Sequence, residues 1–149
     1  MLDLATGLRT EELTALLKHK VYHNEGSLKI IGKGNKERVV WINRALCETA
    51  CRAYEMARDQ KLKALQLESD YYFITNQGTP LTTNLVYQQV SHYMRKAEVK
   101  TERKGAHTLR HTAASLLLKN KVDIVTIQHN FGHEDLQTTI KYLHLIAKI

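Results

Sequence analysis

The sequence contains no apolar run that approaches the ~20 residues needed to span a bilayer. Its first residues, MLDLATGLRTEEL, also lack the basic and then apolar segments of a secretory signal peptide. The two absences predict a soluble chain that works in the cytoplasm, with no membrane as a partner.

Cysteine and proline are scarce. The only cysteines, Cys47 and Cys51, lie four residues apart in a segment with helical periodicity, where both side chains point the same way. A disulfide there would close no useful loop, so we expect two reduced thiols packed as small apolar groups. With one proline, no low-complexity tract and no internal repeat, nothing in the sequence marks a domain boundary.

Acidic residues are outnumbered. Lys and Arg total 22 against 15 Asp and Glu, a net charge of +7, and the sequence pI is about 9.4. The 149 residues suffice for one compact domain but not for two. The positive excess favours a polyanionic partner, and nucleic acid before membrane, because no strongly basic amphipathic helix is visible.

Hydrophobic periodicity predicts a mainly α fold (α+β) with one β-hairpin. A helix starts at Thr10, with an apolar stripe of Leu13, Leu16 and Leu17. The hairpin covers residues 27–42 around a glycine-rich tip at 32–36.

A long amphipathic helix is predicted from residue 44 to about 66, with an apolar stripe of Leu46, Ala50, Ala53, Tyr54, Ala57 and Leu65. Residues 71–74 predict a short strand, and 76–80 a turn. A further helix follows the turn, with Thr82 or Thr83 as its cap. Three more helices are predicted over 108–119, over 123–130 with Asp123 as the cap, and over 135–145.

Four short stretches carry more reactive side chains than packing requires: residues 6–9, 32–34, 107–111 and 132–142. Taken singly, each has a structural explanation. The first could hold a surface arginine, the second an ordinary hairpin lysine, the third a packed histidine pair and the last a buried tyrosine ring. The combination needs another explanation.

Together the stretches resemble the tyrosine recombinases, the phage integrase family. TGLRTEEL at 6–13 resembles the family's first arginine box, and IGKGNKERVV at 31–40 resembles the hairpin that bears the catalytic lysine. HTLRH at 107–111 matches the His-x-x-Arg box, and FGHEDLQTTIKYLH at 131–144 resembles the closing box. Phe131 stands where the family usually has leucine. The resemblance implies the recombinase catalytic-domain fold, with a small sheet carrying the lysine.

The resemblance also implies site-specific recombination or integration of double-stranded DNA. Tyr142 would attack a backbone phosphate and form a 3′-phosphotyrosyl link, which conserves the bond energy for rejoining. Arg9 and Arg110 would bind the non-bridging oxygens. This chemistry requires no metal and no cofactor.

The resemblance implies that other residues of the boxes transfer protons. Lys33 would protonate the leaving 5′-oxygen, with its pKa lowered by neighbouring arginines. His107 would accept the proton of the tyrosine, and His133 would hydrogen-bond the phosphate. Glu12, at the acidic position of the first box, would support the site without taking part in the reaction.

Three other interpretations compete with this one. His107 with His111, and His129 with His133, have the i,i+4 spacing of a zinc site, although no HExxH or CxxC accompanies them. A helical DNA-binding module without catalysis would also fit the charge. A type IB topoisomerase would use a similar tyrosine and arginine clamp to relax DNA.

Arg9 lies close to the start of the chain, so the resemblance predicts a catalytic domain, 1–149, truncated at its N-terminus and lacking core-binding and arm-binding domains. The full-length parent, encoded by a bacterium, a phage or another mobile element, would assemble as a tetramer on DNA. The fragment itself would be monomeric or weakly associating. Apolar residues of the last segment would dock on a neighbouring protomer or pack on their own domain: Leu143, Leu145, Ile146 and Ile149.

Overall fold

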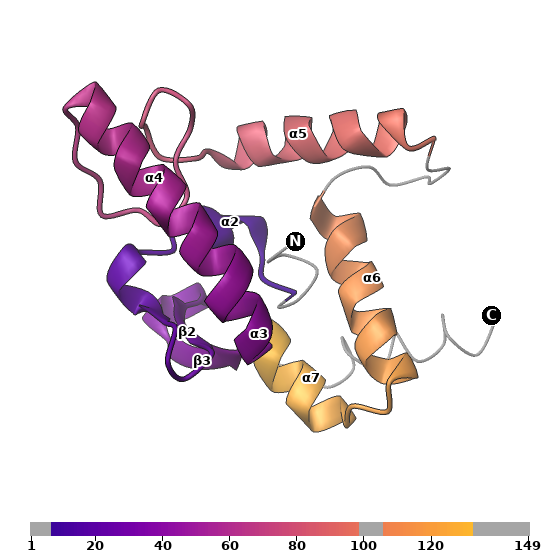
Figure 1. The fold of residues 1–149 in the computed structure, drawn as a ribbon. Coiled ribbons are helices and arrows are strands. Elements are labelled where there is room, and N and C mark those ends of the chain that lie inside the picture. The colour runs from indigo at the N-terminus through magenta and orange to yellow at the C-terminus, as the bar shows by residue number, and fades with distance from the viewer. Residues whose placement is uncertain (1–6, 99–105, 133–149) are drawn as a thin grey trace. The chain divides into compact units, whose positions relative to one another are not determined.

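A computed structural model describes residues 7–98 and 106–132, with the backbone alone for residues 46, 47, 106 and 107 (Figure 1). The chain divides into two compact units. Unit 1 comprises residues 1–9 and 86–149, and unit 2 comprises residues 10–85. The predicted helix over 135–145 lies outside the described residues. Within the described ranges, no helix is long and apolar enough to cross a membrane.

Unit 2 combines short helices with a small sheet. Its elements are α2 (Thr10–Thr14), the 3-10 turn η1 (Lys18–Lys20), β1 (Val21–Tyr22), β2 (Ser27–Ile31), the 3-10 turn η2 (Lys33–Asn35), β3 (Glu37–Trp41), α3 (Arg44–Leu46), the π-turn η3 (Cys47–Cys51) and α4 (Arg52–Leu65). As predicted, a helix starts at Thr10 and buries Leu13. It ends at Thr14, so Leu16 and Leu17 of the predicted stripe lie beyond it, although Leu16 is buried too.

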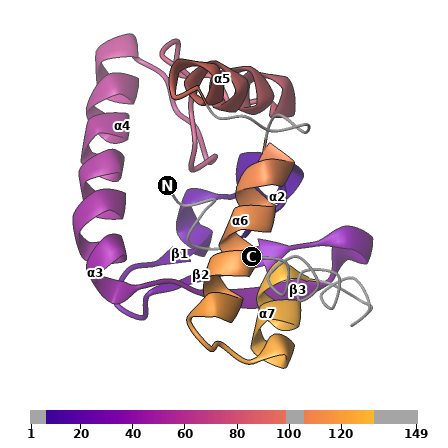
Figure 2. The same cartoon turned by 90° about the vertical axis from the view of Figure 1, so that its right-hand side faces the viewer.

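The three strands form one antiparallel sheet in the order β1-β2-β3. Ser27 pairs with Trp41 at the base of the β2–β3 hairpin, which confirms the hairpin predicted over 27–42. β1 adds a two-residue edge, with Val21 opposite Leu28, that no sequence pattern indicated. The hairpin tip lies at the end of the strands away from α3 (Figure 2).

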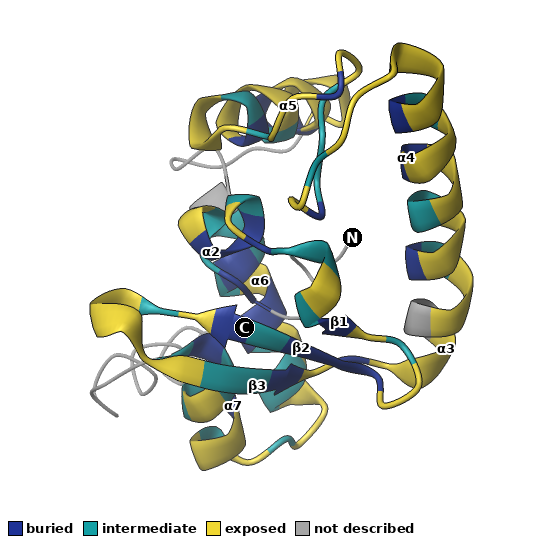
Figure 3. Ribbon diagram, turned by 90° about the vertical axis from the view of Figure 1, so that its left-hand side faces the viewer, coloured by how far each residue is buried: buried dark blue, intermediate teal, exposed yellow. Residues whose placement is uncertain are grey.

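The long helix predicted from residue 44 is present as α3, η3 and α4. Among its described side chains, the buried ones are Cys51, a free thiol as predicted, Arg58 and Leu62. Buried positions follow one side of α4 (Figure 3). The predicted stripe is wrong at three positions that are exposed, Ala53, Ala57 and Leu65. Arg58 is buried on that side instead, and its guanidinium is hydrogen-bonded to several carbonyl oxygens.

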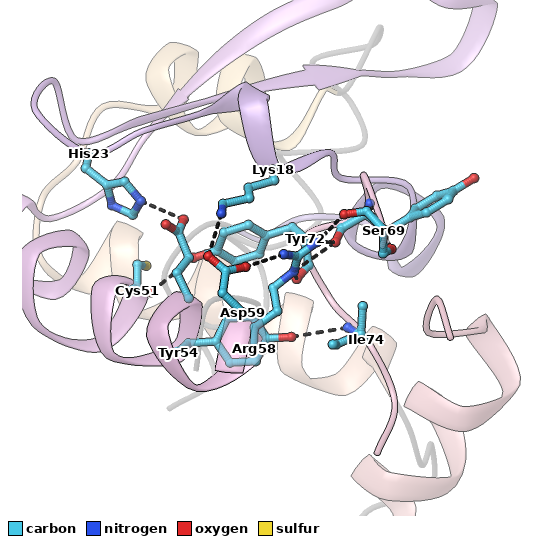
Figure 4. A network of polar contacts seen from close by, with 11 residues as sticks. Lys18, His23, Cys51, Tyr54, Arg58, Asp59, Ser69, Tyr72 and Ile74 are labelled. Atoms are coloured by element: carbon cyan, nitrogen blue, oxygen red, sulfur yellow. Dashed lines mark hydrogen bonds and ion pairs between the residues drawn. The ribbon is translucent and has the colours of Figure 1, made fainter. Parts of the chain in front are cut away.

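Arg58 anchors the loop that follows α4 (Figure 4). Only 3% of this residue is exposed. Its guanidinium donates to the carbonyl oxygens of Ser69 at 2.6 Å, Tyr71 at 2.6 Å and Tyr72 at 3.0 Å. The carboxylate of Asp59 accepts a further hydrogen bond at 2.6 Å. Because a buried guanidinium needs acceptors, these contacts hold the loop in one place.

The strand predicted at 71–74 is wrong. The segment forms only two isolated bridges, Leu17 with Tyr71 and Ile74 with Pro80. The carbonyl groups of Tyr71 and Tyr72 accept from Arg58. The predicted turn at 76–80 is present between the two halves of the second bridge.

In unit 1 the helices are α6 (Ala106–Lys119) and α7 (Ile124–Phe131), preceded by α5 (Thr83–Lys96), which starts at the end of unit 2. Thr82 caps α5 by accepting from the N–H of Leu85, as predicted. α6 and α7 share a buried core of Ala113, Ala114, Ile127 and Phe131, with Leu117, Leu118 and Val122 packed against it.

Local signals set both ends of α7. Asp123 is the N-cap, as predicted, because its carboxylate accepts from the N–H and the hydroxyl of Thr126. These hydrogen bonds lower the pKa of the Asp123 carboxyl below its ordinary value. At the other end Gly132 adopts φ +60° and donates to the carbonyls of Gln128 and His129.

Gly7 lies against the ring of Phe131. Its φ is +63°, and a Cβ at this position would overlap the ring atoms of Phe131. The closing box is thus in contact with the first box through a position that has no side chain.

We expect Gly7→Ala to lower the free energy of unfolding by about 3 kcal/mol. The added methyl group would clash with the ring of Phe131, and alanine is also disfavoured in a left-handed backbone conformation. Gly34→Ala is the matched control, since Gly34 has φ +71° but no atom within 4 Å of a Cβ. It should cost only about 1 kcal/mol. Urea unfolding followed by far-UV circular dichroism measures both. Equal losses would contradict the contact, and Phe131→Leu should recover part of the Gly7→Ala loss.

Candidate active site

Arg110 lies on α6 and is 5% exposed. Its Nη1 donates to the carbonyl oxygen of Gly7, and its Nη2 donates to the carbonyl oxygen of Phe131 at 2.6 Å. Gly7 and Phe131 are themselves buried. One guanidinium therefore joins the His-x-x-Arg box to the first box and to the closing box.

Arg9 reaches the same turn from the other end of the chain. Its Nη2 donates to the carbonyl oxygen of Gly132 at 3.2 Å, across 123 residues of sequence. The two arginines thus contact consecutive carbonyls, those of Phe131 and Gly132, at the end of α7. These carbonyls directly precede His133 in the sequence.

The ring of Phe131 also contacts Arg110. The guanidinium carbon lies 4.7 Å from the ring centroid, within the range of a cation–π interaction. Carbonyl oxygens and the ring face together fix the plane of the guanidinium. Two permanently charged side chains held at adjacent points form a positive centre that suits an anion such as a phosphodiester.

Lys33 lies in unit 2, at the exposed tip of the β2–β3 hairpin. The N–H of Gly32 donates to the carbonyl of Lys36 at 2.8 Å, which closes the tip. Gly34 and Asn35 have φ of +71° and +58°, so the chain reverses tightly after Lys33. The predicted glycine-rich tip is confirmed, and Lys33 is exposed on it.

Glu12 of α2 forms a buried ion pair with Arg38 of β3. Arg38 Nη1 donates to Glu12 Oε1 at 2.7 Å, and Nη2 donates to Oε2 at 2.9 Å. Sequence reasoning proposed a supporting role for Glu12 but missed Arg38. The alternation of side chains along a strand could have indicated it, because Arg38 lies two residues before Val40 and therefore on the same, core-facing side of β3.

The other predicted site residues have no described side chains. His107 lies in the first turn of α6, where the backbone alone is described. His133 and Tyr142 lie outside the described residues. In the part of the chain that the structure describes, no three His, Cys, Asp or Glu side chains gather in a group that could hold a metal ion.

Comparison with protein families gives one match over almost the whole chain. A family model described as the phage integrase family matches residues 1–148. The tyrosine recombinase XerD of Staphylococcus aureus is 35% identical over 147 residues, which cover 97% of this chain and 49% of XerD. The chain spans about half the length of the curated relatives it matches.

Solved structures agree with the family match. The XerH site-specific recombinase, in a post-cleavage complex with palindromic difH substrate, has a TM-score of 0.84 at 28% identity, over 99% of this chain and 41% of XerH. The XerA recombinase has a TM-score of 0.79 at 32% identity, over 95% of this chain and 50% of XerA. The predicted fold class, a mainly helical catalytic domain with a small sheet, is confirmed.

We expect Arg110→Met to lower the free energy of unfolding by about 3 kcal/mol, because two buried carbonyls lose their donor. Arg9→Met should cost less than about 1 kcal/mol, since Arg9 is only half-buried and its bond to Gly132 is longer. Urea titrations of both variants against the unsubstituted chain measure the difference. Equal stabilities for the two variants would show that Arg110 does not hold the boxes together.

Proposed function

The chain belongs to the phage integrase family, and from that membership we propose that it cleaves and rejoins double-stranded DNA at a specific site through a 3′-phosphotyrosyl intermediate. The observation that carries the proposal is the convergence of Arg9 and Arg110 on consecutive carbonyls of one turn. Both residues come from boxes that the sequence alone pointed to. A positive centre of this kind suits a phosphodiester, whose transition state accumulates negative charge on its non-bridging oxygens.

In the proposed reaction the phenolic oxygen of Tyr142 attacks the phosphorus atom. The bond from phosphorus to the 5′-oxygen breaks as the bond to tyrosine forms. His107 accepts the phenolic proton, and the ammonium of Lys33 donates a proton to the leaving 5′-oxygen. His133 hydrogen-bonds the phosphate, and the guanidiniums of Arg9 and Arg110 neutralise its oxygens. A 5′-hydroxyl from a second duplex then reverses these steps, so no nucleotide cofactor is needed.

The partners we propose are duplex DNA and further copies of the protein. The net charge of +7 and the DNA-bound XerH neighbour support the first. A protein as long as these relatives would contain a second DNA-binding domain besides the present one. We propose that such a protein assembles as a tetramer on DNA in the cytoplasm. Contacts of the present chain would fall mainly on the phosphate backbone, so its affinity should decrease steeply with salt.

Tyr142→Phe should abolish the covalent protein–DNA adduct and leave DNA binding intact, because only the attacking oxygen is removed. The substrate is a pool of nicked duplexes with a randomised central sequence. After cleavage, the short piece of strand between the cleavage point and the nick dissociates, so the strand cannot be rejoined and the adduct persists. Denaturing gels measure the adduct, and mobility shifts measure binding. A chain that binds the pool without forming any adduct is a DNA-binding module and not a recombinase. An adduct formed by Tyr142→Phe would exclude Tyr142 as the nucleophile.

Lys33→Ala should slow cleavage by about 10²- to 10⁴-fold, the usual contribution of a general acid. Replacing the leaving 5′-oxygen by sulfur should restore the rate, since a thiolate leaves without a proton. Cleavage rates on the two duplexes, both of a sequence selected from the pool, measure the effect. If the sulfur substrate is cut as slowly as the oxygen substrate, another group is the acid.

A further inference from the structure

The ion pair between Glu12 and Arg38 is built more tightly than a surface ion pair. Its two parallel hydrogen bonds, 2.7 Å and 2.9 Å long, fix the plane of the guanidinium as well as its position. The side chains of Arg38 and Glu12 are only 10% and 5% exposed. Water therefore competes little for these hydrogen bonds, and removal of either partner leaves a buried charge.

The backbone of Gly32 rests directly against this pair. A Cβ placed on Gly32 would lie 3.1 Å from Arg38 Nη1 and 3.6 Å from Glu12 Oε1. Gly32 is also the residue whose N–H closes the hairpin tip on Lys36. The buried pair thus lies next to the tip at the residue that immediately precedes Lys33, where a side chain would crowd it.

The opposite face of the same hairpin carries a second set of ion pairs. Glu37, the neighbour of Arg38, contacts Lys29 Nζ at 3.1 Å and Lys20 Nζ at 3.3 Å. The hydrogen bond from Lys29 is the main cause of a lowered pKa of Glu37. The Glu37 side chain is 44% exposed, so water reaches these ion pairs and weakens them. Glu37 therefore offers a matched control for Arg38 on the same strand.

We propose that Arg38 is a positioning residue that, through its pair with Glu12, holds the hairpin tip so that the Lys33 ammonium reaches the leaving oxygen. This inference rests on the proposed function, in which Lys33 is the proton donor. The lysine is exposed and its stem is flexible, so its reach depends on where the tip backbone is held. A general acid must come within hydrogen-bond distance, and a displacement of about 1 Å can cost about 10²-fold in rate.

The pair also ties two boxes of the family together. Glu12 lies on α2, which begins at the residue after Arg9, and Arg38 lies on the strand that leaves the tip. The ion pair between Glu12 in the first box and Arg38 in the hairpin box therefore determines the position of the tip relative to α2. A lysine at position 38 keeps the charge but cannot make both parallel hydrogen bonds.

The test compares cleavage of two nicked duplexes that differ only in the leaving atom, oxygen or sulfur, by the unsubstituted chain and four variants. The quantity measured is the ratio of the sulfur rate to the oxygen rate. Any loss of folded protein slows both substrates alike, so the ratio reports proton donation alone. The variants are Lys33→Ala, Arg38→Lys, the combination of these two, and Glu37→Gln.

We expect Arg38→Lys to raise the ratio about 10- to 100-fold, toward the value of Lys33→Ala. The combined variant should match Lys33→Ala alone, because a tip without its lysine has no proton donor to position. Glu37→Gln should keep the ratio of the unsubstituted chain. An unchanged ratio in Arg38→Lys, or a combined ratio above that of Lys33→Ala, would overturn the inference.

Failure of the proposed function has a different signature. In that case the unsubstituted chain forms no adduct with either duplex, or Lys33→Ala leaves the ratio unchanged. If the unsubstituted chain cleaves and Lys33→Ala raises the ratio, the assigned chemistry stands, and the Arg38 result decides the inference by itself.

Discussion

The buried guanidinium of Arg110 is the contact on which unit 1 depends. An arginine keeps its charge at every physiological pH, so burial requires acceptors around it. The carbonyl oxygens of Gly7 and Phe131 supply them, one from each of two distant segments. A group that holds the fold together is then also fixed in orientation, which is the preorganisation that stabilisation of a charged transition state needs.

Buried guanidiniums with several hydrogen-bond acceptors also occur at two places in unit 2. Arg38 is paired with Glu12 beneath the hairpin tip, and Arg58 is hydrogen-bonded to the carbonyls of the loop after α4. In each case a buried guanidinium holds a segment that has little apolar surface of its own. A loop or tip of this kind gains few contacts from hydrophobic packing, so directed hydrogen bonds determine its position.

Much of the local structure could be predicted because its causes lie within a few residues. The Gly-Lys-Gly tip, the Asp123 cap and the Thr82 cap each depend on the backbone and on neighbours one turn away. The strand at 71–74 failed for the opposite reason. Its apolar pattern fits a strand, but the segment makes only isolated bridges, and its carbonyls accept from the guanidinium of Arg58 on another element.

The sequence by itself determined the four boxes, their order and the types of charged group they contain, since these depend only on which residues occur at which spacing. Only the tertiary structure decided that Arg9 and Arg110 meet at one turn, that Arg38 pairs with Glu12, and that Gly7 makes room for the ring of Phe131. Each of these contacts joins residues far apart in the chain. No local pattern encodes such a pair, because the partner is chosen by the packing of the elements that carry it.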